Sequence, residues 1–168
     1  MRDNLDGLLA LTDWVREQGF DGHTFQPVAT TDFFQGKKPQ GPRWYEESPL
    51  WPDRDQALAF VDEIERRRDA GYPIRNSDND FRHFRAYFRD PVAFGRAENC
   101  ESELKTMLVT HDGHVKMCPN TDEPFGHILK DELDEMWGSP AAVRARRHVY
   151  ECESQCKILA NTKEDFYF

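Results

Sequence analysis

The placement of the four cysteines is the feature of this sequence that most constrains its fold. All of them lie in the last 69 of 168 residues, in the pattern C-x17-C, a gap of 33 residues, and C-x3-C. No apolar run approaches the roughly 20 residues that a membrane span needs, and residues 1–20 lack the pattern of a signal peptide. We therefore expect a cytoplasmic protein, and cysteines in that compartment are more often metal ligands or thiols than structural disulfides. The four candidate ligands are Cys100, Cys118, Cys152 and Cys156.

A predicted hairpin brings the first two cysteines together. Residues 103–118 form two short β-type runs around Asp112-Gly113, and Asp-Gly between β-formers is a strong hairpin signal. Cys100 stands at the entry of this hairpin and Cys118 at its exit. The last two cysteines follow a predicted helix that can fold back onto the hairpin. Four converging thiolates would suit tetrahedral zinc or an iron–sulfur cluster.

The cysteine spacing alone does not choose between these metals. Zinc sites typically place two to four residues between paired cysteines, and the first pair here has 17 between them. A [4Fe–4S] cluster is larger, so distant single cysteines can serve its corners. Unligated thiols remain a third alternative at this stage.

The rest of the chain predicts a helical scaffold with little strand. Apolar residues at helical spacing predict helices over residues 3–18, 54–70 and 78–89, the last with a stripe of phenylalanines. The sequence of residues 23–28 predicts a short strand, and a helix followed by a short strand is the order of elements in an α/β unit. Residues 29–53 show no period and are typical of a lid, a binding loop, a linker or a loop pinned by its own aromatic side chains. Two further helices are predicted over residues 130–137 and 140–150.

The charge balance excludes some partners. The net charge is −9, with 14 basic against 18 acidic residues before Cys100 and 8 against 13 from there on. An acidic chain without a basic stripe is a poor candidate for nucleic acid or an anionic membrane, so we expect neither partner. The basic cluster Arg144, Arg146 and Arg147 either screens a nearby anionic cluster or covers the carbonyls at the end of its helix.

Other polar residues give weaker signals. His111-x2-His114 spans the predicted turn and could bind a metal, although a polar turn is the more ordinary place for both. Gln26, at the end of the predicted strand, is the single residue we would name as a substrate contact, because barrel-type sites place substrate groups there. A structural role is the more common one for such a residue. Nothing resembles a Ser/His/Asp triad or a phosphate-binding glycine loop, so the sequence names no catalytic residue.

The C-terminal third carries several motifs in a recognisable order. They are Gly113-x4-Cys118, Phe125-Gly126-x-Ile128, Leu133-x3-Trp137-x-Ser139 and Cys152-x3-Cys156. With Cys100 ahead of them, they make residues 100–156 resemble the SPASM/twitch region of radical S-adenosylmethionine enzymes. The resemblance implies that the two hairpin cysteines and the late pair hold an auxiliary [4Fe–4S] cluster. It also implies that this cluster passes electrons or helps to hold a peptide or small-molecule substrate.

The upstream part resembles the same family less sharply. Residues 3–28 resemble a late helix–strand unit of its partial (β/α)6 barrel, and residues 54–91 resemble the segment that links barrel and auxiliary domain. The C-x3-C-x2-C motif of the cluster that cleaves S-adenosylmethionine is absent, since position 159 is Leu159. We therefore expect the C-terminal part of such an enzyme, or a truncated relative, with S-adenosylmethionine a cofactor of the full-length form only. A missing N-terminal barrel portion, or a partner chain, would complete it.

These expectations combine into one prediction and its alternatives. The predicted fold class is α+β or α/β, with the partial end of a (β/α)6 barrel followed by a small hairpin-plus-helix domain. The first alternative is a zinc-stabilised structural or binding module without redox activity, and the second is a truncated product without metal. The expected organisation is a barrel remnant and loop (1–53), linking helices (54–99), an auxiliary-cluster domain (100–156) and a C-terminal tail (157–168).

Overall fold

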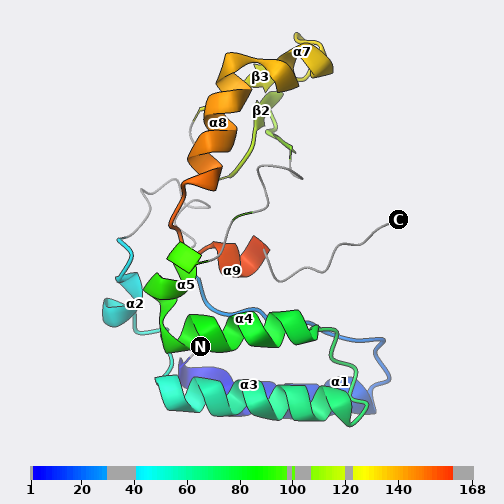
Figure 1. Cartoon of the computed structure of the whole chain (residues 1–168). Helices are drawn as coiled ribbons and strands as arrows, with labels where there is room; N and C mark the ends of the chain where they lie inside the picture. The colour runs from blue at the N-terminus through cyan, green and yellow to red at the C-terminus, as the bar shows by residue number, and fades with distance from the viewer. Residues whose placement is uncertain (1, 30–40, 98–99, 101–106, 120–122, 161–168) are drawn as a thin grey trace.

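The protein combines helices with one small antiparallel sheet. The computed structural model describes residues 2–29, 41–97, 100, 107–119 and 123–160. Figure 1 shows two bodies joined by chain segments that run between them. We call the body with α1 to α5 and α9 the helical lobe, and the body with β1 to β3, α7 and α8 the hairpin lobe. The α+β expectation is confirmed in this form, and the described residues include no β/α barrel.

The elements are divided between the two lobes. The helical lobe contains the 3₁₀ turn Arg2–Asn4, α1 (Leu5–Glu17), α2 (Trp44–Glu47), α3 (Arg54–Asp69), α4 (Asp78–Arg89), α5 (Pro91–Ala97) and α9 (Lys157–Ala160). The hairpin lobe contains β1 (Leu108–Val109), β2 (His114–Lys116), β3 (Gly126–His127), α7 (Leu133–Gly138) and α8 (Pro140–Tyr150).

Side-chain caps fix where the two longest central helices begin. The Asp53 carboxylate accepts hydrogen bonds from the backbone N–H groups of Asp55 and Gln56 at the start of α3. At the start of α4, Ser77 and Asp80 form a reciprocal capping box. Each cap satisfies donors that have no partner within the helix, and such a cap is worth about 0.5–2 kcal/mol. Both helices therefore begin within a residue of the sequence prediction.

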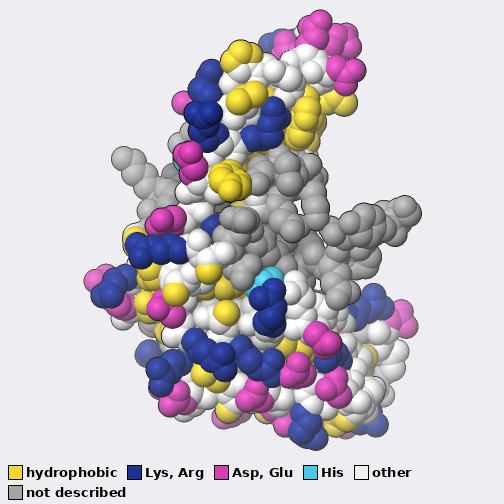
Figure 2. Space-filling view, viewed as in Figure 1, with side chains coloured by type: hydrophobic (Ala, Val, Ile, Leu, Met, Phe, Trp, Pro, Cys, Tyr) yellow, Lys and Arg dark blue, Asp and Glu magenta, His cyan; other side chains and the backbone are white. Residues whose placement is uncertain are grey.

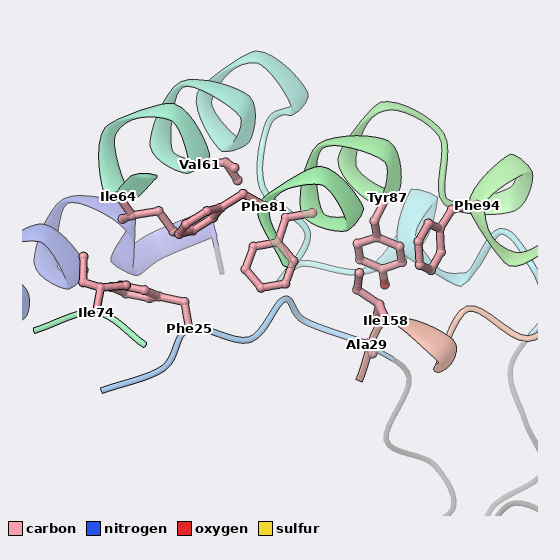
Figure 3. Close-up of a cluster of buried hydrophobic side chains, with 10 residues drawn as sticks. Phe25, Ala29, Val61, Ile64, Ile74, Phe81, Tyr87, Phe94 and Ile158 are labelled. Atoms are coloured by element: carbon pink, nitrogen blue, oxygen red, sulfur yellow. The ribbon is translucent and has the colours of Figure 1, made fainter. Parts of the chain in front are cut away.

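The core of the helical lobe lies between α3, α4 and α5, with α9 closing one end (Figure 3). Phe81 and Phe84 of the predicted phenylalanine stripe are buried, and Phe88 packs against them. Tyr87 is also fully buried, and its hydroxyl donates to the Val28 carbonyl at 2.8 Å. The predicted aromatic face of α4 is thus confirmed as core packing. On α1, by contrast, the apolar side chain of Leu11 is exposed.

Residues 23–28 were predicted to form a strand, but they do not form one in the structure. The segment makes only one isolated parallel bridge, between His23 and Ile74. Two residues further on, the Asn76 side chain takes the place of a partner strand. Its Oδ1 accepts from the Phe25 N–H at 2.8 Å, and its Nδ2 donates to the Phe25 carbonyl at 3.0 Å. The segment is extended and buries Phe25, yet no continuous ladder forms along it.

Three helices of this lobe, α2, α5 and α9, were not predicted. The helix predicted over residues 78–89 ends at Arg89 as α4, and Pro91 then begins α5. Proline suits a first helical position, and the Asp90 carboxylate caps the new helix by accepting from Val92 and Ala93. Lys157–Ala160, in the part expected to be a tail, form α9.

The hairpin lobe follows the predicted order. β1 pairs with β2 across the Asp112-Gly113 turn, in the register Leu108 opposite Lys116. Gly113 has a φ of +86°, a conformation that glycine adopts without strain. The strand β3, which was not predicted, adds to β2 on its other side. The buried core beneath the sheet consists of Cys100, Val115, Met117, Phe125, Met136, Ala142 and Val149.

Within the described residues, every helix is too short or too polar to cross a membrane.

Candidate metal centre

The first two cysteines belong to the core of the hairpin lobe. Cys100 is 8 % exposed and is a member of that core, beside Val115 and Met117. Cys118 is half-buried and packs against the same core. The hairpin thus brings its entry and exit cysteines to one apolar cluster, as predicted from the Asp-Gly turn.

The last two cysteines share one serine. The N–H of Ser154 donates to the Cys152 sulfur at 3.3 Å, and the Ser154 hydroxyl donates to the Cys156 sulfur at 3.2 Å. Donors aimed at sulfur favour the thiolate, which is the form that binds metals. In iron–sulfur proteins such hydrogen bonds also help to set the reduction potential. The segment 151–156, which we call the cysteine loop, therefore presents two sulfurs with their donors already in place.

The cysteine loop is anchored to the helical lobe by a glutamine. Gln155 is 3 % exposed, and its Oε1 accepts from the indole N–H of Trp44 at 2.8 Å. Its amide nitrogen donates to the Pro42 carbonyl. A buried amide with both ends bonded is held in one orientation. Gln155 thus ties the chain between the two late cysteines to the start of α2.

Helix α5 approaches the same loop at close range. A Cβ on Gly95 would lie 2.5 Å from the Glu153 carbonyl oxygen, so only glycine fits there. Lys157 is 3 % exposed, and its ammonium donates to the Gly95 carbonyl at 2.7 Å. Arg96 pairs with Glu153 at 3.2 Å. These contacts, with Ile158 in the helical core, hold the middle and the C-terminal end of the loop against α4 and α5.

The late pair also lies near a buried tyrosine. Burial, together with the Cys156 sulfur, raises the pKa of Tyr87 above its usual range. Its hydroxyl stays protonated and bonded to the Val28 carbonyl. Cys156 therefore borders the aromatic core of the helical lobe, while Cys100 borders the core of the other lobe.

The structure brings the four predicted ligands together as two pairs. All four cysteines are among the described residues, and none forms a disulfide bond. Within the described part of the chain, no three His, Cys, Asp or Glu side chains form a metal-binding group. The chemistry of the donor set nevertheless fits an iron–sulfur cluster, because both pairs offer sulfur, and one pair carries N–H and O–H donors to it. The assignment of the four cysteines as ligands stays a prediction.

The other predicted site residues lie apart from this centre. Gln26 is exposed, and its role as a substrate contact also stays a prediction. His114 contacts Asp112 at 3.1 Å and meets His127 edge-to-face, with ring centroids 5.3 Å apart. The ring contact of His114 is thus with a histidine of β3, whereas His111 lies in the turn.

Four residues of the centre escaped the sequence analysis: Ser154, Gln155, Lys157 and Gly95. The signal for Ser154 was available, since it is a hydroxyl residue between two closely spaced cysteines. Gln155 and Lys157 act through partners 111 and 62 positions away in the sequence. No local pattern could have shown those contacts.

The comparisons with known proteins agree with the placement of this centre. A family model described as SPASM, an iron–sulfur cluster-binding domain, matches residues 100–158. Searches of curated proteins and of solved structures gave no match. The matched segment contains all four cysteines and ends at Ile158, inside the helix that anchors the cysteine loop. Residues 100–158 therefore form a SPASM-type iron–sulfur cluster-binding domain.

Proposed function

We propose that the four cysteines hold one auxiliary [4Fe–4S] cluster in a radical S-adenosylmethionine enzyme. The observation that carries this proposal is that the SPASM-type domain contains two sulfur pairs, one of which is already hydrogen-bonded through Ser154. The ligands would be Cys100 and Cys118 from the hairpin lobe, and Cys152 and Cys156 from the cysteine loop. When bound, such a cluster supplies one-electron chemistry.

The residues around the cysteines have separate roles in this proposal. Ser154 donates a hydrogen bond to each of the two late sulfurs. Gln155 and Lys157 hold the cysteine loop against α2 and α5, so that the late pair is positioned before the metal binds. The apolar surroundings of Cys100 shield that cysteine from water. The chain thus supplies two pairs of cysteine sulfurs. One pair is held by the core of the hairpin lobe, and the other by the contacts of the cysteine loop.

The wider activity follows from the family and not from the described site. We propose that the chain acts with a (β/α)6 barrel, from its own full-length form or from a partner chain, in which S-adenosylmethionine is cleaved. The substrate would be a peptide or small molecule, and the cluster would transfer electrons or position that substrate. The chain alone would not cleave S-adenosylmethionine, because it lacks the C-x3-C-x2-C motif.

The test is the metal content of the reconstituted chain. After anaerobic reconstitution we expect about four iron and four sulfide per chain, with absorption near 400 nm and an EPR signal on reduction. Cys118→Ala should lose most of the iron because one of the four ligands is gone. Val109→Ala, an exposed change in the same hairpin, should retain it.

Zinc is the competing outcome. The short C-x3-C spacing of the late pair also suits a zinc site. One tightly bound zinc per chain, with no iron uptake, would replace the redox proposal by a zinc-stabilised module. A chain that binds neither metal would overturn both.

A further inference from the structure

The exposed face of α8 carries basic charge that the rest of the described structure does not neutralise. Arg144, Arg147 and His148 all face solvent. Within the described residues, none of the three has an acidic group in an ion pair. The third arginine of the helix is occupied, since Arg146 donates to the Trp137 carbonyl at 3.0 Å and lies over that indole ring. Arg146 therefore packs on α7. It neither covers the carbonyls at the end of its own helix nor is left to screen an anionic cluster, which were the two roles considered for these arginines.

The arginines of the helical lobe behave differently. Arg66 and Arg67 both bond to Glu63, and Arg67 also pairs with Asp13. The guanidinium groups of Arg68 and Arg85 likewise pair with neighbouring carboxylates. Figure 2 shows blue and magenta side chains intermixed on that lobe, whereas blue gathers along α8 and magenta at the tip beside α7. The basic face is therefore a local feature of a chain whose net charge is −9.

Apolar side chains flank the basic face. Val143 is 46 % exposed and Tyr150 is 60 % exposed, and helical spacing places both on the same arc as Arg147. Arginine and tyrosine are the residues most often found at energetic centres of interfaces. A surface of this composition fits a macromolecular partner with acidic groups around an apolar contact.

The face lies directly beside the candidate metal centre. Helix α8 ends at Tyr150, and the N–H of Cys152 donates to the Val149 carbonyl at 3.3 Å. A partner on this face would therefore be within a helical turn or so of a predicted cluster ligand. One helix face can supply only a small contact area, which is the size class of weak electron-transfer encounters. Nucleic acid would need more cations than three to gain a useful number of phosphate contacts.

We propose that Arg144, Arg147, His148 and Tyr150 form the docking face for an acidic electron-transfer protein. The inference rests on the proposed cluster, which gives the electron its destination. One electron leaves the reduced metal centre of the partner, which is oxidised, and enters the cluster held by the four cysteines, which is reduced. No bond forms or breaks, and no proton is transferred. Opposite charge steers the acidic partner onto the basic face and accelerates the encounter.

The experiment uses the full reconstituted chain and a reduced plant-type [2Fe–2S] ferredoxin as the acidic probe. The rate of cluster reduction is followed by stopped-flow absorption at low and at high salt. The double variant Arg144→Glu/Arg147→Glu should slow reduction by roughly 10- to 100-fold at low salt and remove most of its salt dependence. The control variant Arg75→Glu/Arg89→Glu makes the same change in net charge on exposed residues of the helical lobe. It should change the rate by less than about threefold, because these two residues lie on the helical lobe and outside the docking face.

Reduction by dithionite separates docking from cluster damage. Both double variants should react with dithionite at the wild-type rate and should hold the wild-type amount of iron. Equal slowing of ferredoxin in the two double variants, or no slowing in either, would overturn the docking face. Failure of the wild-type chain to take up iron would instead contradict the proposed function, and the docking face would then be tested by ferredoxin binding in calorimetry alone. Unchanged binding in Arg144→Glu/Arg147→Glu would reject it.

Discussion

The two lobes are stabilised by cores of different composition. Among the described residues, the core of the helical lobe contains five buried aromatic side chains, and it is covered by helices of 12 to 16 residues. The hairpin lobe buries a single aromatic residue, Phe125, and three residues with sulfur, which are Cys100, Met117 and Met136. Its strands are two or three residues long. Aromatic residues bury large areas, whereas a small core often needs a metal or a disulfide as support.

This difference teaches that the two lobes depend on the candidate metal centre unequally. In the part that the structure describes, the buried core of the helical lobe includes no cysteine, so we expect this lobe to depend less on the metal. The hairpin lobe has a small core that includes Cys100, and Cys118 packs against that core. The cysteine loop directly follows α8 of the hairpin lobe, but its side chains are held by contacts to the helical lobe.

Removing the metal should have the largest effect. Metal binding to a small domain is coupled to its folding, so chelation should reduce amide protection in residues 107–119 and 123–150 by roughly 10,000-fold or more. Protection in α3 and α4 should change by much less, with an intermediate loss in α9. Hydrogen exchange with mass spectrometry measures all three regions in one experiment. Equal losses in both lobes would contradict the unequal dependence.

A cavity in the helical core should give the next largest effect. Phe81→Ala removes a fully buried ring and should lower the free energy of unfolding by about 3–5 kcal/mol. Urea unfolding of the metal-loaded chain, followed by circular dichroism, measures this change. Leu129→Ala, at a site 84 % exposed, is the control and should leave stability within about 0.5 kcal/mol. If Phe81→Ala changed stability no more than its control, the aromatic core would not support the lobe.

The contact between α5 and the cysteine loop can be tested with one methyl group. Gly95→Ala places a Cβ 2.5 Å from the Glu153 carbonyl, so the loop must shift at a cost of about 1–3 kcal/mol. Iron retained after desalting should fall, because the late cysteines move with the loop. Gly138→Ala is the matched control, since nothing lies within 4 Å of its Cβ. Higher stability and full iron in Gly95→Ala, as helix propensity alone would give, would show that the loop is free to move.

Acid should have the smallest effect, and it should appear in the helical lobe. Hydrogen bonds from Arg66 and Arg67 lower the pKa of Glu63 to about 2. A depressed pKa in the folded state contributes stability above the unfolded pKa of about 4.3. That contribution is lost as the pH falls from about 4.5 through 2. Solvent screening limits it to about 1 kcal/mol or less. The melting temperature of Glu63→Gln should therefore be lower than that of the wild type at pH 6, and the two melting temperatures should converge near pH 2. A constant difference across this range would exclude the ion pair as its source.

The sequence predicted the elements whose signals are local. Helical spacing placed α1, α3, α4 and α8, and the Asp-Gly turn placed the hairpin and its two cysteines. Residues 23–28 were wrongly predicted as a strand because a side chain, Asn76, supplies the partner that a neighbouring strand would have supplied. Helix α5 was not predicted, although Pro91 is compatible with the first position of a helix. The hydrogen bond between Gln155 and Trp44 joins positions that are too far apart in the sequence for any local pattern to show it.

The pairing of Asn76 with Phe25 has a consequence for self-association. An extended segment with a vacant backbone edge can recruit a strand from another molecule, and that is a route to aggregation. Here a single amide occupies both the donor and the acceptor of Phe25. Asn76 is itself 2 % exposed and additionally bonded to Asp80, so a competing strand cannot easily displace it. One buried side chain thus closes this edge at Phe25 to intermolecular β-pairing.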